Sequence, residues 1–109
     1  MPLVEVLRRA NDLAWTDALY VEPGVELSLS LPVIIHDVDD VDEVTDLPHE
    51  VSALGWDYLL DVQTVQSVVA NARAQRPRAT EAELLDALRH YMRRDAFIDW
   101  GSAPDTLNR

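Results

Sequence analysis

The chain of 109 residues contains no cysteine, no lysine and only three glycines, and it has no long hydrophobic run. The absence of cysteine excludes disulfide bonds, thiolate metal sites and a cysteine nucleophile. Three glycines are too few for a phosphate-binding loop, because such loops need several exposed backbone amides. No apolar stretch approaches the roughly 18 residues that span a membrane, and the N-terminus lacks the layout of a signal peptide. We therefore expect a cytoplasmic protein.

The charge of the chain is strongly negative and unevenly distributed, with a formal net charge of −11. Residues 1–66 hold fourteen acidic residues against two arginines, which gives −12. Residues 67–109 hold six acidic residues against seven arginines, which gives +1. A polyanion repels nucleic-acid phosphates and anionic membranes and attracts basic proteins. We therefore expect a basic protein as partner, and neither direct nucleic-acid binding nor membrane binding.

The acidic residues are densest in the segment HDVDDVDEVTD, residues 36–46, which places six carboxylates in eleven positions. Its three valines are three residues apart. That spacing makes a poor helical stripe, because each step drifts by about 60° around a helix. Aspartate and valine are also indifferent helix formers. We predict a loop here.

Hydrophobic periodicity predicts the elements on either side of this loop. Apolar residues at helical spacing predict helices at 3–13, 46–55 and 62–75, and a further helix that begins at Thr80. Alternation or short apolar runs predict strands at 18–21, 25–31, 33–36, 56–60 and 95–100. The run 33–36 is apolar on both faces, as in a central strand. Asp61 is expected to cap one helix, and Thr80 and Glu83 form a capping box at the start of another.

This order of elements predicts an α+β fold. We expect a small single-domain sandwich in which a three- to five-stranded sheet packs against three or four helices. The domain is expected to cover residues 1–100, followed by a flexible C-terminal tail at 101–109.

No set of residues for catalysis or metal binding can be assembled. A calcium loop that starts at Asp37 would place valine at its fifth position, aspartate at its sixth and proline at its twelfth, where a ligand, glycine and glutamate are needed. The three histidines show no helical spacing, and no serine lies in a GxSxG motif. We therefore predict a protein that is not an enzyme, with no catalytic residue, no metal site and no cofactor.

Two aromatic residues follow the acidic segment. Trp56 or Tyr58, if exposed, would act as an interface anchor surrounded by acidic residues. Core packing is the expectation for at least one of them. The acidic segment itself has a plain alternative role, which is to keep the protein soluble.

The segments DALYV, VIIHDVDD, LLDVQTVQSVVANAR and DAFIDW, together with the size, the acidity and the lack of catalytic motifs, resemble small bacterial immunity proteins of polymorphic or contact-dependent toxin systems. The resemblance spans nearly the whole chain and carries over no catalytic residue. It implies a cytoplasmic antitoxin that binds a cognate toxin, often a basic nuclease, and occludes its active site.

The function expected from these observations is inhibition of a basic partner protein by a monomer or weak dimer. The partner-binding residues that we predict are Asp37, Asp39, Asp40, Asp42, Glu43, Asp46, Trp56 and Asp57. One alternative is a nucleic-acid mimic of the phage anti-restriction or anti-CRISPR type, which needs carboxylates at phosphate-like intervals along an extended face. Another is a plain interaction module that uses the arginines of residues 73–94.

Overall fold

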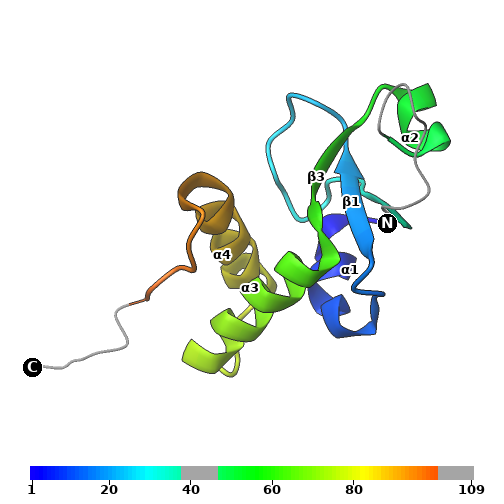
Figure 1. Ribbon diagram of the computed structural model, residues 1–109. Helices are drawn as coiled ribbons and strands as arrows, with labels where there is room; N and C mark the ends of the chain where they lie inside the picture. The colour runs from blue at the N-terminus through cyan, green and yellow to red at the C-terminus, as the bar shows by residue number, and fades with distance from the viewer. Residues whose placement is uncertain (38–46, 101–109) are drawn as a thin grey trace, which may run out of the picture.

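The computed structural model describes residues 1–37 and 47–100. Its centre is a three-stranded antiparallel sheet in the order β2–β1–β3. The strands are β1 (Asp17–Val21), β2 (Ile34–Asp37) and β3 (Asp57–Asp61). The helices are α1 (Leu3–Arg8), α2 (His49–Leu54), α3 (Val62–Gln75) and α4 (Glu81–Arg94), with a 3₁₀ turn η1 (Ala10–Asp12) (Figure 1). The predicted α+β fold is confirmed, with the sheet at the small end of the expected range.

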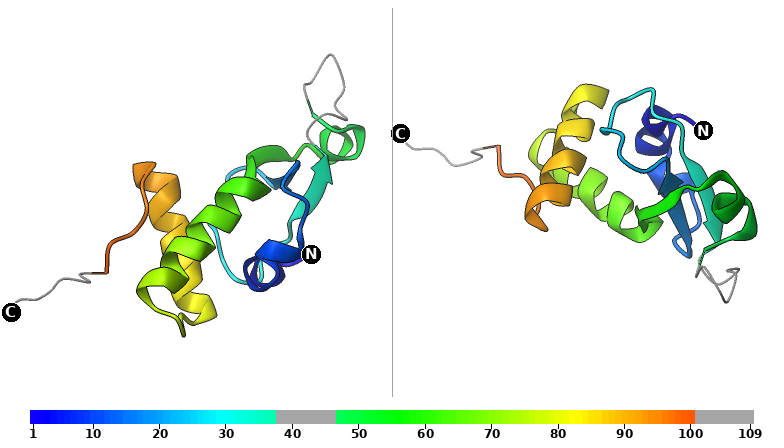
Figure 2. Two further views of the ribbon diagram at one scale, coloured as in Figure 1. Left: turned by 60° about the horizontal axis from the view of Figure 1, so that its bottom comes forward. Right: turned by 90° about the horizontal axis from the view of Figure 1, so that it is seen from above.

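The main core lies between one face of the sheet and the helices α1, α3 and α4. Leu7, Leu19, Val65 and Leu88 come from four different elements and are all fully buried in it. The helices α3 and α4 pack side by side in both views of Figure 2. Because burying one such side chain contributes about 1.5–3 kcal/mol, this core holds the sheet and three helices together.

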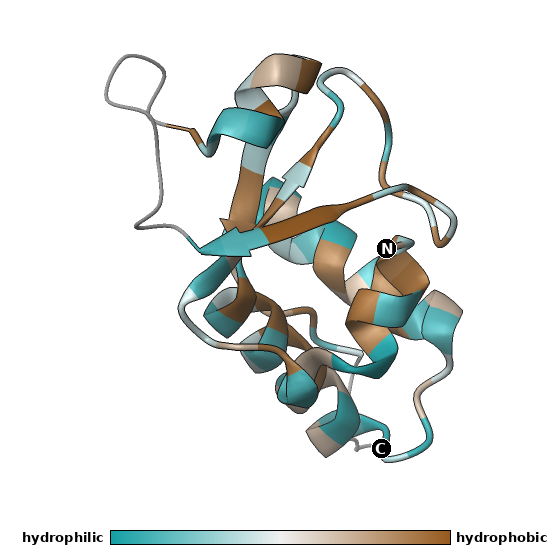
Figure 3. Ribbon diagram, turned by 90° about the vertical axis from the view of Figure 1, so that its right-hand side faces the viewer, coloured by the Kyte–Doolittle hydropathy of each residue, from teal (hydrophilic) through white to brown (hydrophobic). Residues whose placement is uncertain are grey.

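The opposite face of the sheet is covered by the single short helix α2 (Figure 3). Ala18 and Tyr20 of β1 alternate with the main-core residues of the same strand and pack against Val51 of α2. Half-buried Ile34, Leu47 and Trp56 complete what we call the small cluster. We call this side of the sheet the α2 face. The helix α2, which packs on this face, has only six residues.

Strand β3 contains an irregularity that changes where its side chains point. Leu60 pairs with Leu19, but the next pair is Tyr58 with Tyr20, so Leu59 has no opposite residue. This is the pattern of a β-bulge, which re-aims the residues on one side of the extra position. Leu59 and Leu60 both pack on the main core. Tyr58 and Asp61, three residues apart, therefore share the α2 face.

Two of the predicted strands, 25–31 and 95–100, are wrong, and the strand predicted at 33–36 is present at a different place in the sheet. Residues 25–31 form no strand, because their backbone groups bond elsewhere: the carbonyl of Leu29 accepts from the Val4 amide at 2.9 Å and that of Leu31 accepts from the Leu3 amide at 2.8 Å. The segment thus satisfies the first amides of α1 instead of a ladder. The run 33–36 does contribute a strand, but β2 is an edge strand and β1 is the central one.

Residues 95–100 also form no strand. Asp95 adopts a left-handed conformation (φ 53°) that ends α4 and turns the chain. The side chain of Gln75 then bonds to the segment, donating to the Ile98 carbonyl at 2.6 Å and accepting from the Trp100 amide at 3.1 Å. The segment is therefore held by α3 rather than by the sheet.

The four predicted helices are present, and two of them are shorter than predicted. The helix expected at 46–55 begins at His49, after Pro48 at its N-cap position, and ends at Leu54. The first helix ends at Arg8 rather than continuing to residue 13, and η1 follows it. The Gln66 side-chain amide donates to the carbonyls of Ala10 and Leu13 at 2.9 and 3.1 Å, which holds this irregular backbone against α3. The predicted tail at 101–109 lies outside the described residues.

Both predicted helix caps are confirmed, and one of them gives a direct stability test. Thr80 accepts from the Glu83 amide at 3.2 Å, and the Glu83 side chain accepts from the Thr80 amide at 2.9 Å. Thr80→Ala is expected to lower the free energy of unfolding by about 1 kcal/mol, because one orphan amide loses its acceptor. Urea denaturation measures this loss. Ser67→Ala, in an exposed position within α3, is the control and is expected to change stability by less than about 0.5 kcal/mol; equal effects would contradict the capping role.

Candidate functional site

The structure separates the predicted partner-binding residues that it describes. Asp37 is exposed at the end of β2 and lies opposite Asp17. Asp57 is exposed at the start of β3 and lies opposite Val21. Asp17 and Val21 are four residues apart along β1, so the two predicted carboxylates are at opposite ends of the sheet, about 13 Å apart along the strands. The predicted residues Asp39, Asp40, Asp42, Glu43 and Asp46 lie outside the described residues.

Trp56, also predicted as a partner-binding residue, lies just before β3 and is half-buried against the small cluster. Its ring therefore contributes to the packing of α2 on the sheet. Tyr58 behaves differently, since 52% of its surface is exposed. The expectation that at least one of the two aromatic residues packs in the core is confirmed, and Tyr58 is the exposed one.

Two further carboxylates lie at the same end of the sheet as Asp37. Asp17 is its cross-strand neighbour, and Asp61 lies opposite Ala18, the next residue of β1. Like charges directly opposite each other across two strands are unfavourable. Sequence reasoning assigned Asp61 only to a helix cap and gave Asp17 no role, because which residues face each other depends on strand register. This end of the sheet therefore concentrates negative charge from three strands.

Four arginines in the described part of the chain pair instead with carboxylates on the helices and on η1. Arg8 bonds to Glu5 at 2.8 Å and also to Glu81, and Arg76 bonds to Glu83. Two longer pairs join Arg9 to Asp12 at 3.9 Å and Arg89 to Asp86 at 3.7 Å. Within residues 1–37 and 47–100, no arginine pairs with Asp17 or Asp57 of the strands.

These ion pairs lower the pKa values of two glutamate side chains on α4. The hydrogen bond from Arg8 lowers the pKa of Glu81 below its ordinary value. The Thr80 amide, followed by the Arg76 guanidinium, lowers the pKa of Glu83. Burial raises the pKa of Tyr58, and the negative charge of Asp61 raises it further. The Tyr58 hydroxyl is therefore protonated at neutral pH.

One contact ties α2 to the edge of the sheet. His36 of β2 lies with its Nε2 atom 2.8 Å from Glu50 Oε1 of α2. His36 and the small-cluster residue Ala18 are cross-strand neighbours, so the contact lies on the α2 face. In the described part of the chain, no three His, Asp or Glu side chains are arranged to hold a metal ion.

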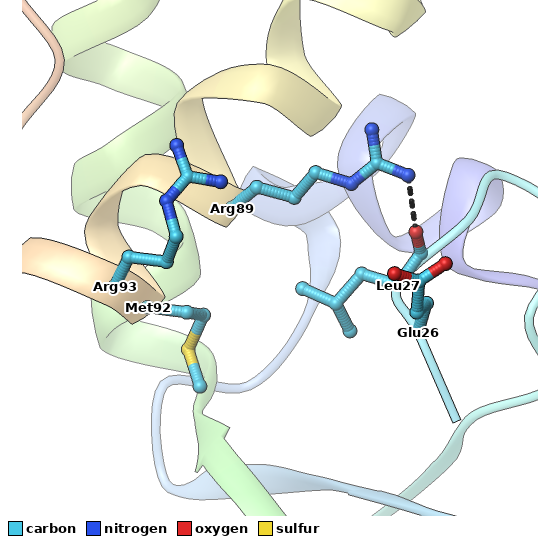
Figure 4. A pocket seen from close by; sticks show the side chains of 5 residues that line it. All are labelled: Glu26, Leu27, Arg89, Met92 and Arg93. Atoms are coloured by element: carbon cyan, nitrogen blue, oxygen red, sulfur yellow. Dashed lines mark hydrogen bonds between the residues drawn. The ribbon is translucent and has the colours of Figure 1, made fainter. Parts of the chain in front are cut away.

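A shallow groove lies elsewhere on the molecule, between α4 and the segment that follows β1. Its volume is about 210 Å³, and it is lined by Glu26, Leu27, Arg89, Met92 and Arg93 (Figure 4). The Arg89 side chain extends from α4 and donates to the Leu27 carbonyl at 2.6 Å. The groove shares no residue with the small cluster or with the carboxylates of the strands. Arg89 thus serves to hold the irregular segment against α4.

The fold and these charges define an α+β protein with an acidic sheet end. Residues 1–100 match the family described as "Domain of unknown function (DUF7716)", and the chain belongs to that family. No curated protein and no solved structure matches the chain. No helix in residues 1–37 or 47–100 is both long enough and apolar enough to cross a membrane.

Proposed function

We propose that this protein is a non-enzymatic inhibitor that binds a basic partner protein, and that it acts as an immunity protein which neutralises a cognate toxin such as a nuclease. The single observation that carries the proposal is the division of charge. Four arginines pair with carboxylates on the helices and on η1, whereas Asp17 and Asp57 on the strands have no arginine partner among the described residues. The carboxylates of Asp17 and Asp57 are thus available to a positively charged protein.

The physical reason for such a design lies in the chemistry of nucleases. A protein that cleaves a phosphodiester backbone holds phosphate with basic residues, so its active site attracts carboxylates that take the place of phosphates. Complementary charge raises association rates to about 10⁸–10⁹ M⁻¹s⁻¹ at low salt. An immunity protein benefits from this speed because it must occupy the toxin before the toxin acts. The net charge of −11 matches that requirement.

The function is tested with the proteins encoded by the reading frames adjacent to this gene. Each is purified, and its binding to the full chain is measured by surface plasmon resonance from about 50 to 500 mM salt. We expect one of them to bind with an association rate that falls steeply with salt, to arrest growth when produced alone, and to be harmless when co-produced with this chain. The proposal fails if no neighbour binds, or if the protein that binds is not toxic.

A different result separates the nucleic-acid mimic from the toxin inhibitor. A mimic occupies the DNA-binding groove of its target, so duplex DNA competes with it for any target that it binds. A captured protein whose binding is abolished by DNA, and which does not arrest growth, would therefore replace the immunity function with mimicry.

A further inference from the structure

Tyr58 is an exposed aromatic residue that the fold holds in a fixed position. Its ring packs edge-to-face against Tyr20, with ring centroids 5.9 Å apart and an interplanar angle of 74°. Tyr20 is itself buried in the small cluster. The remaining 52% of the surface of Tyr58 faces solvent. A rigid, half-exposed aromatic ring of this kind loses little conformational entropy on binding and is typical of interface anchors.

Asp61 lies next to this ring because of the bulge at Leu59. In a regular strand, residues three apart point to opposite faces. The extra residue instead places both side chains on the α2 face, with Tyr58 opposite Tyr20 and Asp61 opposite Ala18. The negative charge of Asp61 also raises the pKa of Tyr58.

The Asp61 carboxylate is also fixed in place. Its Oδ1 atom accepts from the Thr64 amide at 2.7 Å, which caps α3. Within the described residues, no arginine pairs with it, so one oxygen remains available for a donor from outside. A fixed aromatic face thus stands beside a fixed carboxylate, at the acidic end of the sheet that also holds Asp17 and Asp37.

We propose that Tyr58 and Asp61 together form a receptor site for an arginine side chain of the basic partner. This inference rests on the proposed function, and it specifies the chemistry of the partner. The planar guanidinium stacks on the Tyr58 ring while its N–H groups donate to the Asp61 carboxylate. A lysine ammonium fits less well, since it is strongly hydrated and has no plane to stack. The chain makes a similar contact internally, where the Arg76 guanidinium lies 4.5 Å from the centroid of the Trp100 ring.

The site is tested by NMR titration of the full chain with two capped peptides, Ac-Gly-Arg-Gly-NH₂ and Ac-Gly-Lys-Gly-NH₂, at equal ionic strength. The ring signals of Tyr58 are assigned by their loss in Tyr58→Leu. We expect the arginine peptide to shift these signals saturably, and to bind about two- to fivefold more tightly than the lysine peptide. The ring signals of Tyr91, which packs against Phe97, serve as the internal reference and should stay in place. Equal responses to the two peptides, or none at Tyr58, overturn the proposal.

Variants separate the two halves of the site. Tyr58→Leu removes the aromatic face, and Tyr58→Phe retains it. Asp61→Asn removes the charge but keeps an acceptor for the Thr64 amide, because asparagine caps helices as well as aspartate does. Tyr58→Leu and Asp61→Asn are each expected to weaken binding of the arginine peptide about two- to fivefold, and Tyr58→Phe much less. Glu22→Gln, an exposed residue beyond the end of β1, is the matched control for loss of one charge and should bind as the unchanged protein does.

The peptide titration needs no toxin, so it tests the arginine site independently of the proposed function. If the arginine peptide binds at Tyr58 but no neighbouring gene product binds the chain, the proposed function falls and the site stands. If a neighbouring toxin binds the chain, and Tyr58→Leu and Asp61→Asn bind that toxin as tightly as the unchanged chain does, the site falls and the proposed function stands.

Discussion

Replacing Leu19 with alanine is expected to lower the free energy of unfolding by about 2–5 kcal/mol. Leu19 lies at the middle of the central strand β1 and is fully buried in the main core. It pairs with Ile35 of β2 on one side and with Leu60 of β3 on the other. Removing its side chain therefore leaves a cavity where all three strands meet the helices. Because domains of this size have a total stability of about 5–15 kcal/mol, the variant is expected to be close to its unfolding threshold.

Urea denaturation followed by circular dichroism measures this loss, and Val51→Ala is the informative comparison. Val51 is equally buried, but it belongs to the small cluster under α2. Its truncation removes about two buried methyl groups and is expected to cost roughly 1.6 kcal/mol. If Val51→Ala destabilises the protein more than Leu19→Ala does, the main core is not the principal source of stability.

The elements that could be predicted from the sequence are those whose signal is local. Helices α3 and α4 follow from apolar spacing and from caps at Asp61 and Thr80, and all of these are confirmed. The segment 25–31 alternates like a strand, and three of its residues do face the core. Its backbone nonetheless bonds to α1 and to the Arg89 side chain. Periodicity reports which side chains are buried, and it does not report where the backbone hydrogen bonds go.

Which side chains lie together at the candidate site could not be predicted from the sequence, because this depends on how the strands pair. Asp37 and Asp57 are both acidic and both flank a strand, yet antiparallel pairing places them at opposite ends of the sheet. Tyr58 and Asp61 share a face only because Leu59 is an extra residue in β3. Register and bulges depend on contacts between distant parts of the chain, so a single sequence carries little trace of them.

The position of the acidic residues, as well as their number, is expected to affect binding to the proposed basic partner. Charges separated by more than about 10 Å are screened at 0.1 M salt, so a partner responds mainly to the carboxylates nearest its own basic surface. Two possibilities can therefore be distinguished: association depends on the net charge of the protein, or on the carboxylates of one particular segment. If only the net charge of −11 matters, any three carboxylates are equivalent; if the acidic segment is the interface, its carboxylates count for more.

Changing Asp39, Asp40 and Asp42 together to lysine is expected to slow association with the proposed toxin partner about tenfold or more at low salt, because electrostatic steering contributes 10- to 1,000-fold to such rates. The dependence of the rate on salt should flatten at the same time. The matched control is Asp12, Glu22 and Glu26 changed to lysine, which alters the net charge by the same amount at exposed positions outside the predicted partner-binding set. Stopped-flow measurements across salt concentrations compare the two. A control that slows association as much as the first variant would show that steering depends on total charge alone, and the acidic segment would then have no special place in recognition.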